Sequence, residues 1–266
     1  MLYFCAIFHY NGPISGMKGG DTVGELIAVL SGKGGTGKTS LCAGIATALA
    51  EQGQRVLCID CDVGLRNLDI SLGLSQEGAL SFLDVTEGEY SLAQATVHPQ
   101  YPKLSFLTAP VNCQVEKVDK AAFRAMLFEA RTKYHYIFLD APAGIDGGFQ
   151  LAAQFADRVV LVTGPDPAAV RDASRAAQLL ELMGKKDVRL IVNRIHKKML
   201  SAVKMTVDDV MDTAGLPLLG VVPEDPNVVL AAAFGKPLLQ QTRRGAGAAC
   251  RRIAKRLQGQ KISIRL

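Results

Sequence analysis

The hydrophobic residues from Leu26 onward fall into short, nearly uniform apolar runs that alternate with longer segments of helical spacing. Strands without a polar face must be covered on both sides, as in a parallel sheet, and the helical segments supply that cover. The pattern therefore predicts a doubly wound α/β fold with a mostly parallel sheet and helices on both faces. Strands are expected at 25–30, 55–60, 103–109, 136–140, 157–163, 188–193 and 217–222, and helices at 39–53, 119–134 and 167–183.

The composition is that of an ordinary globular protein, because 48% of the 266 residues are hydrophobic and 21% are charged. The longest apolar runs, 1–8 and 228–234, are far shorter than the ~20 residues that a membrane-spanning helix needs. No linker-like run, low-complexity block or internal repeat divides the chain. We therefore expect one domain over residues 23–258 and no transmembrane segment.

Residues 1–22 precede the first predicted strand and show neither helical nor alternating spacing. They also lack the basic start and small-residue cleavage site of a secretory signal. The codons of Lys-Gly-Gly at 18–20 can contain a purine-rich ribosome-binding site, and Val23 can be a GTG start codon. The hypothesis is that the natural chain begins at Val23 or Met17 and that residues 1–22 are a non-native or disordered extension. Mass spectrometry of the native N-terminus tests it.

The six cysteines give little sign of a metal site. The one close pair, Cys58 and Cys61, lies at a predicted strand, where residues three apart face opposite sides of the sheet. These thiols are poorly placed to chelate one metal, so we expect buried apolar cysteines. The histidines are isolated from one another and from the cysteines, and we assign no role to them.

A glycine-rich segment follows the first predicted strand and leads into the first predicted helix. Residues 32–39, GKGGTGKT, match G-x-x-x-x-G-K-[ST] in the strand-to-helix context that this phosphate-binding motif requires. Its glycines let backbone N–H groups point inward, and the helix N-terminus adds partial positive charge for β- and γ-phosphates. Lys38 is expected to neutralise phosphate charge, and the Thr39 hydroxyl to ligate Mg²⁺. The predicted nucleotide contacts are Gly32, Lys33, Gly34, Gly35, Thr36, Gly37, Lys38, Thr39 and Ser40.

Carboxylates follow two other predicted strands, at the edge of the sheet where ligands of such folds bind. Asp60 and Asp62 come at the end of the second run, and Asp140 comes at the end of the fourth. Asp140 fits the role of holding the Mg²⁺ shell through water, and Asp62 fits that of polarising the attacking water in phosphoryl transfer. The predicted metal residues are therefore Thr39, Asp62 and Asp140. A helix cap is the alternative role for any one of these aspartates.

With these residues assembled, the sequence closely resembles the MinD branch of the deviant Walker A ATPases, a group that also contains ParA partition proteins and nitrogenase iron protein. The group's mark is K-G-G-x-G-K-[ST], in which Lys33 is the additional lysine. The resemblance implies that Lys33 reaches across an ATP-sandwich dimer to the phosphates of the partner subunit, much as an arginine finger acts in trans. Lys33, Lys38 and Asp62 are therefore the expected catalytic residues.

Three segments favour the MinD branch in particular. IDCDVGLRNLDISLGL, residues 59–74, resembles its first switch region, and DAPAGID, residues 140–146, resembles the second. VRDASR, residues 170–175, resembles a helix whose aspartate, here Asp172, is linked in the family to dimer contacts and partner binding.

The resemblance extends from about Glu25 to Leu257 and includes two candidate adenine-binding segments. These are VNR at 192–194 and VPED at 222–225. They imply base contacts from Asn193, which would read the base edge, from Pro223, which would pack near the ring, and from Asp225.

A member of this branch binds ATP, dimerises, attaches to the inner face of the cell membrane and recruits the division inhibitor MinC, until hydrolysis of ATP to ADP and phosphate releases it. The resemblance therefore implies ATP and Mg²⁺ as cofactors, and a second copy of the chain, a MinC-like inhibitor and a MinE-like or other activator as partners. It also implies a peripheral location on the cytoplasmic face of the membrane and a role in placing the septum. The alternative is a ParA-like nucleoid-binding partition or positioning ATPase, including flagellar-number regulators.

The end of the chain is strongly basic. Between Arg243 and Arg265 there are eight lysines and arginines and no acid. Residues 248–258 have amphipathic helical spacing and align with the family's last core helix, and residues 259–266 form a short tail that is a candidate for membrane contact. The apolar face of the helix would consist of Cys250, Ile253, Ala254 and Leu257.

Three interpretations of this basic end are open. It is a core helix with a solvated charged face and a frayed end, a contact for anionic lipid, or a non-specific DNA contact as in ParA relatives. Sedimentation with anionic liposomes in the presence of ATP, compared with retention on DNA, discriminates between the last two. A scaffold for iron–sulfur clusters would need paired cysteines that bridge a dimer, and the one C-x-x-C is in the wrong place for that.

Overall fold

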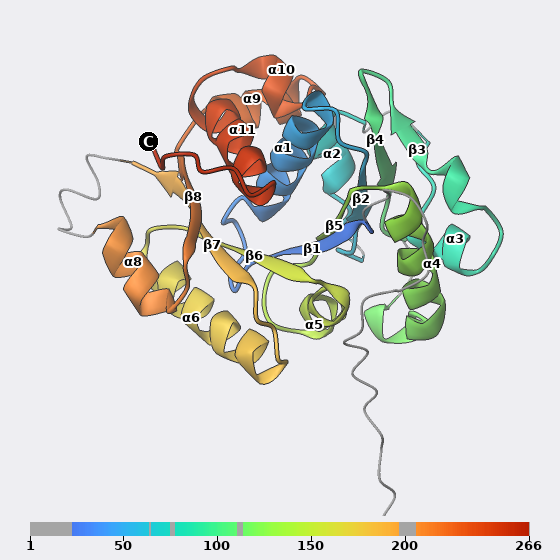
Figure 1. The fold of residues 1–266 in the computed structure, drawn as a ribbon, viewed down its shortest axis with the longest axis horizontal. Helices are drawn as coiled ribbons and strands as arrows, with labels where there is room; N and C mark the ends of the chain where they lie inside the picture. The colour runs from blue at the N-terminus through green and yellow to red at the C-terminus, as the bar shows by residue number, and fades with distance from the viewer. Residues whose placement is uncertain (1–22, 64, 75–77, 111–113, 197–205, 266) are drawn as a thin grey trace, which may run out of the picture.

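The structure of the protein is a computed structural model in which a sheet is covered by helices on both faces (Figure 1). The proposed N-terminal extension, residues 1–22, lies outside the described part of the chain. The residues that the structure describes are 23–63, 65–74, 78–110, 114–196 and 206–265.

The sheet has eight strands within the described residues. In order across the sheet they are β3 (Thr96–His98), β4 (Tyr101–Leu107), β2 (Val56–Asp60), β5 (Tyr136–Asp140), β1 (Glu25–Leu30), β6 (Arg158–Thr163), β7 (Val188–Ile195) and β8 (Leu218–Pro223). Every pairing is parallel except that of β3 with β4. The strands predicted from the apolar runs are confirmed. Strand β3 was not predicted, because it has only three residues and two of them, Thr96 and His98, are polar.

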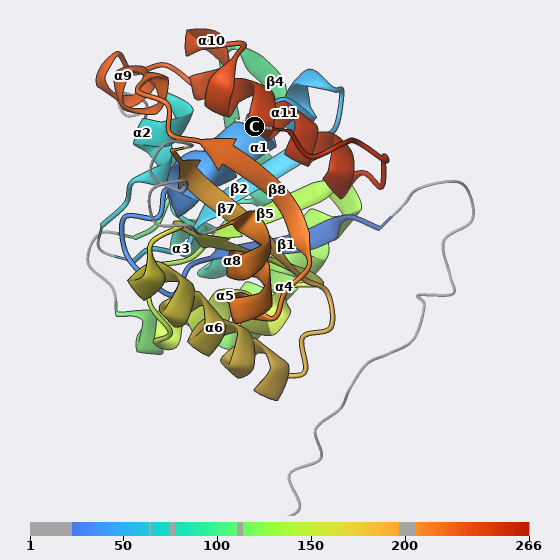
Figure 2. The ribbon, with the colours of Figure 1, turned by 90° about the vertical axis from the view of Figure 1, so that its left-hand side faces the viewer.

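One face of the sheet carries the helix that follows the glycine-rich loop and the helix at the end of the domain. The helices of this face are α1 (Lys38–Glu51), α2 (Leu68–Leu72), α9 (Asn227–Ala233), α10 (Leu238–Gln241) and α11 (Gly245–Leu257). Figure 2 shows α11 lying along α1, with which it makes many contacts. Because α1 is rich in alanine, the sheet and α11 can both approach it closely, and its residues from Leu41 to Ala50 are all buried.

The opposite face carries five helices that come from the segments between β2 and β8 (Figure 1). They are α3 (Phe82–Thr86), α4 (Lys120–Lys133), α5 (Gly147–Phe155), α6 (Pro167–Leu182) and α8 (Val207–Ala214), with short 3₁₀ turns at Leu92–Gln94 and Val115–Lys117. Phe82 and Phe123 meet edge to face in this core, with ring centroids 5.3 Å apart. Two apolar layers therefore enclose the sheet.

The two cysteines of the C-x-x-C segment belong to different layers. Cys58 packs in the core on the α1 side of the sheet, and Cys61 packs in the core on the opposite side. Both are buried free thiols. The expectation that they face opposite sides of the sheet is confirmed.

Helix α11 is part of the core, as one of the three interpretations of the basic end expects. The four residues of its expected apolar face are all buried. Residues 259–265 beyond it form neither helix nor strand, and Nη2 of Arg252 donates to the carbonyl of Arg265 at 2.9 Å. Among the described residues, no helix is both long enough and apolar enough to cross a membrane.

Candidate functional site

The glycine-rich loop joins β1 to α1 at the carboxyl edge of the sheet. Gly35 and Gly37 have left-handed backbones, with φ of 77° and 83°, which residues with a side chain rarely adopt. A Cβ atom at Gly37 would in addition lie 2.3 Å from Nδ2 of Asn193. The conformation and the space at position 37 therefore both require glycine.

The first turn of α1 opens onto a cavity of about 330 Å³. Gly37 is the N-cap, and no side chain caps this turn. Its first N–H groups have no partner within the helix, and the helix dipole makes the same end attractive to an anion. Loop residues 34–40 line the cavity together with Asp62 and Asn67. These features fit a bound phosphate group.

Lys38 is held in a buried ion pair at this cavity. Its Nζ donates to Oδ1 of Asp140 at 2.7 Å and to Oγ1 of Thr39 at 3.1 Å, and the side chains of Lys38 and Asp140 are only 6% and 1% exposed. Burial alone would lower the pKa of Lys38, but the charge and hydrogen bond of Asp140 outweigh burial and raise this pKa above its usual value. The ammonium group therefore stays charged at neutral pH.

The predicted metal residues lie around the same lysine. Asp140 is the last residue of β5, and its carboxylate accepts from Lys38. The Thr39 hydroxyl oxygen accepts a hydrogen bond from the same Nζ. Asp62 lines the cavity, and burial raises the pKa of its carboxyl group. Across the described residues there is no group of three or more histidines, cysteines and acids that could hold a metal by itself. A magnesium ion here would need phosphate oxygens and water to complete its shell, which is the coordination that Mg²⁺ prefers.

Asp60 shapes the loop that carries Asp62. Its Oδ1 accepts from the backbone N–H of Asp62 at 2.9 Å, and its Oδ2 accepts from the N–H of Leu68 at 3.1 Å. Burial, with a smaller effect of the nearby Asp140 charge, raises the pKa of Asp60 to about 7. The Asp60 carboxylate therefore ties the loop to the first residue of α2, whose N-cap is Asn67, and Asp62 lines the cavity.

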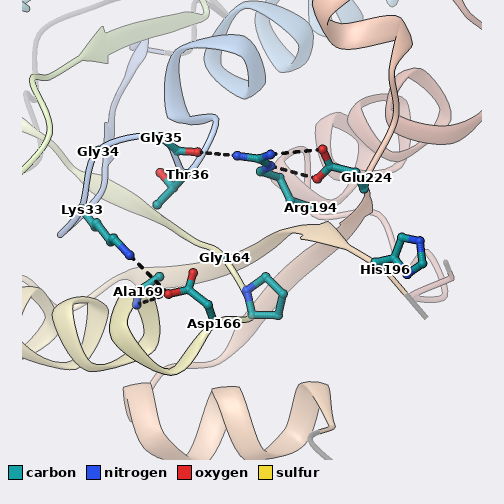
Figure 3. A pocket seen from close by; sticks show the side chains of 11 residues that line it. Lys33, Gly34, Gly35, Thr36, Gly164, Asp166, Ala169, Arg194, His196 and Glu224 are labelled. Atoms are coloured by element: carbon teal, nitrogen blue, oxygen red, sulfur yellow. Dashed lines mark hydrogen bonds and ion pairs between the residues drawn. The ribbon is translucent and has the colours of Figure 1, made fainter. Parts of the chain in front are cut away.

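Lys33 lies at the rim of the site rather than inside it. Its Nζ donates to Oδ1 of Asp166 at 3.3 Å, and the two side chains are 43% and 45% exposed (Figure 3). Asp166 is the N-cap of α6, where Oδ1 also accepts from the N–H of Ala169. Sequence reasoning did not identify Asp166, although an aspartate followed by Pro167 is a recognisable helix start.

A second cavity, of about 190 Å³, contains the predicted base contacts. Asn193 and Pro223 line it, and Nδ2 of Asn193 donates to the carbonyl of Thr36 at 2.7 Å. This bond fixes which end of the amide is the donor side, so the acceptor Oδ1 points away from the Thr36 carbonyl. The carboxylate of Asp225 lines the cavity too, but it accepts from the N–H groups of Asn227 and Ala246.

Two residues beside these predicted contacts were missed by sequence reasoning. Arg194 follows Asn193 and forms a bidentate ion pair with Glu224, the residue after Pro223. The only sign in the sequence that Arg194 and Glu224 belong to the site was that each lies next to a predicted base contact. The two residues are 30 apart in sequence, so their pairing appears only in the folded chain.

The fold and the uncapped, glycine-rich loop define a P-loop nucleotide-binding domain. The family model described as "CobQ/CobB/MinD/ParA nucleotide binding domain" matches residues 27–238. The septum site-determining protein MinD of Synechocystis sp. is 37% identical over 241 residues, which are 90% of this chain and 91% of that protein.

Solved structures agree with this assignment. The MinC:MinD cell division protein complex of Aquifex aeolicus contains a similar chain, with a TM-score of 0.84 and 36% identity over 91% of this chain and 98% of that one. MinD of Pyrococcus horikoshii complexed with Mg-ADP matches with a TM-score of 0.77 and 28% identity over 88% of this chain and 95% of that one. The chain belongs to the MinD septum site-determining family of nucleotide-binding ATPases.

Proposed function

We propose that the protein is a Mg²⁺-dependent ATPase that forms an ATP-sandwich dimer, attaches to the inner membrane surface and recruits a MinC-like division inhibitor to place the septum. The observation that carries the proposal is that the two lysines of the loop differ in burial. Lys38 is buried against Asp140 beside the uncapped turn of α1, and Lys33 stands half exposed at the rim. Burial suits Lys38 to the phosphate site of its own chain, and exposure allows Lys33 to leave Asp166 and reach a partner.

In this proposal the N–H groups of the loop and Lys38 hold the β- and γ-phosphates. Thr39 would ligate a bound Mg²⁺ and Asp140 would hold its outer shell, and the ion would supply positive charge for the phosphate oxygens. Asp62 orients the attacking water, whose oxygen forms a bond to the γ-phosphorus while the bond to the β,γ-bridging oxygen breaks. Of the two protons of the water, one stays on the released phosphate and the other passes to solvent. Lys33 of the partner subunit neutralises the charge that develops on the departing ADP.

The fixed orientation of Asn193 supports adenine as the base. Its Nδ2 is held by the Thr36 carbonyl, so its Oδ1 would accept from a donor on the base edge. Adenine presents an amino group where guanine presents a carbonyl oxygen. Pro223 would pack near the ring, whereas the Asp225 carboxylate contributes by holding the turn that forms the cavity.

The cell division role is supported by the family and by the basic end of the chain. The Aquifex aeolicus relative is found in a complex with MinC, which supports a MinC-like partner for this chain. Nearby basic residues favour anionic lipid by ~1 kcal/mol each, and a dimer brings two tails to one surface. A peripheral location on the cytoplasmic face of the membrane and release by a MinE-like or other activator complete the proposal.

Vesicle sedimentation tests the membrane step. With ATP, the wild type should pellet with vesicles containing phosphatidylglycerol and remain in solution with pure phosphatidylcholine, and ADP should abolish pelleting. Lys38→Ala is the control that should not pellet under any condition. Retention on non-specific DNA without pelleting on anionic vesicles would overturn the membrane role and favour the ParA-like alternative.

A further inference from the structure

Arg194 has an unusual backbone at the end of β7. Among the described residues, only Arg66 and Arg194 have positive φ without being glycine, and φ of Arg194 is 58°. The pairing of β7 with β8 shifts register between Val192 and Ile195, which places one extra residue in β7 at this point. A bulge of this kind re-aims a side chain, and such strain persists where the surroundings hold it in place.

The re-aimed side chain joins two loops of the site. Nε and Nη2 of Arg194 donate to the two carboxylate oxygens of Glu224 at 2.9 and 3.2 Å, and Nη1 donates to the carbonyl of Gly35 at 3.1 Å (Figure 3). The planar guanidinium pairs with both carboxylate oxygens through one edge and still reaches the Gly35 carbonyl, whereas lysine has no such fork. The side chains of Arg194 and Glu224 are 55% and 44% exposed, and ion pairs this exposed contribute little to folding stability. Their geometry therefore points to a role at the loop rather than in the core.

Two successive residues of β7 thus hold two successive carbonyls of the phosphate loop. Asn193 binds the Thr36 carbonyl, and Arg194 binds the Gly35 carbonyl. In a trans peptide the C=O and the following N–H point in opposite directions. Fixing the carbonyls of Gly35 and Thr36 on the β7 side therefore turns the N–H groups of Thr36 and Gly37 away from β7.

We propose that Arg194, oriented by Glu224, is a positioning residue that keeps the N–H groups of the loop turned toward the phosphates before nucleotide arrives. Donors that are fixed in advance bind an anion more tightly, because no free energy is spent on ordering the loop. Gly35 needs such support, since a glycine with φ of 77° has easy access to other conformations. The inference rests on the proposed phosphate site and adds a residue that acts on it indirectly.

Calorimetric titration with ADP, on the full chain, tests the proposal. Arg194→Ala should bind ADP about five- to tenfold more weakly than the wild type, which is the usual worth of one hydrogen bond to an ordered partner. Arg251→Ala is the matched control, because Arg251 forms the same bidentate fork with Glu51 far from the loop, at 2.8 and 3.0 Å. This control should bind ADP as the wild type does.

A second variant separates positioning from general stability. Arg194→Gly removes the side chain but fits the left-handed backbone, so the nucleotide-free protein should melt at or above the temperature of Arg194→Ala. It should nevertheless bind ADP as weakly as Arg194→Ala. Recovery of affinity in Arg194→Gly would show that strain relief, and not the lost contact, governs binding, and would overturn the proposal.

Kinetics and a double variant complete the test. Phosphate contacts made equally in bound ATP and in the transition state raise KM and leave kcat unchanged when they are weakened. Arg194→Ala should therefore raise KM about five- to tenfold at constant kcat. Adding Glu224→Ala to Arg194→Ala should weaken ADP binding no further, because Glu224 acts through Arg194.

The controls distinguish failure of this inference from failure of the proposed site. If Lys38→Ala loses ADP binding while Arg194→Ala keeps wild-type affinity, the role of Arg194 is wrong and the phosphate site stands. If Lys38→Ala binds ADP as the wild type does, the phosphate site itself is wrong, and the positioning role fails with it.

Discussion

Lys33 and Lys38 lie five residues apart in one glycine-rich loop, yet the fold gives them opposite surroundings. Lys38 starts α1, is almost fully buried, and sits 2.7 Å from the buried carboxylate of Asp140. Lys33 is half exposed and lies 3.3 Å from Asp166, an equally exposed carboxylate at the start of α6. The two ion pairs contain the same chemical groups but differ in their access to water.

The difference in exposure indicates which of the two lysine side chains can leave its partner. Removing one member of a buried pair leaves an uncompensated charge in a medium of low polarity, so Lys38 is fixed beside Asp140. Water and salt screen an exposed pair, so Lys33 can leave Asp166 at little cost. A fixed lysine suits the site of its own chain, and a movable lysine suits the site of another chain.

The largest expected effect comes from removing the fixed charge. Lys38→Ala should weaken ADP binding at least about 100-fold, because it removes a buried positive charge from the phosphate cavity. Calorimetric titration measures the loss, and circular dichroism checks that the variant is folded. Near wild-type affinity in a folded variant would mean that Lys38 does not contact phosphate.

Neutralising the partner of Lys38 should chiefly affect stability. Asp140→Asn keeps the shape of the side chain but leaves the Lys38 ammonium buried without a counter-charge, so the free energy of unfolding should fall by about 3 kcal/mol. Urea unfolding of the nucleotide-free protein measures it. A change below about 1 kcal/mol would contradict the view that this pair is held away from water.

The movable lysine should matter to the dimer and not to its own site. Lys33→Ala should bind ADP within about twofold of the wild type, since its charge lies at the rim and is screened. The same variant should fail to form the ATP-dependent dimer in light scattering. A dimer that still forms with ATP would refute a role for Lys33 in trans.

The smallest effect is expected at Asp166. Asp166→Asn removes the partner charge of Lys33 while asparagine still caps α6, so the free energy of unfolding should stay within about 1 kcal/mol of the wild type. Urea unfolding under the conditions used for Asp140→Asn makes the two carboxylates directly comparable. If Asp140→Asn and Asp166→Asn lowered the free energy of unfolding equally, the Lys38 and Lys33 ion pairs would not differ in strength as the account requires.

The sequence predicted the strands, and the glycine-rich loop between β1 and α1, because both have local signals. Buried parallel strands appear as uniform apolar runs, and the loop motif is contiguous. Helix α5 was not predicted, since its first residues, Gly147 and Gly148, are poor helix formers and tertiary packing decides its conformation. Strand β3 depends in the same way on its pairing with β4.

The contacts that complete the site could not be predicted, because they join distant segments. Lys38 and Asp140 are 102 residues apart, and Arg194 and Gly35 are 159 apart. The resemblance implied a base contact for Asn193 but did not indicate that its amide would hold the Thr36 carbonyl. Sequence motifs indicate which residues belong to a site, whereas the fold determines which atoms each residue contacts.

The central claim is that Lys38 serves the site of its own chain and Lys33 that of the partner, and mixing two inactive variants tests it most directly. Lys33→Ala and Asp62→Ala should each hydrolyse ATP at least about 100-fold more slowly than the wild type. In a mixed dimer, the site on the Lys33→Ala chain keeps its own Asp62 and receives an intact Lys33 from the Asp62→Ala chain. The account predicts that the mixture regains ATP turnover well above the sum of the separate variants. No gain on mixing, with both variants folded and binding ATP, would contradict it.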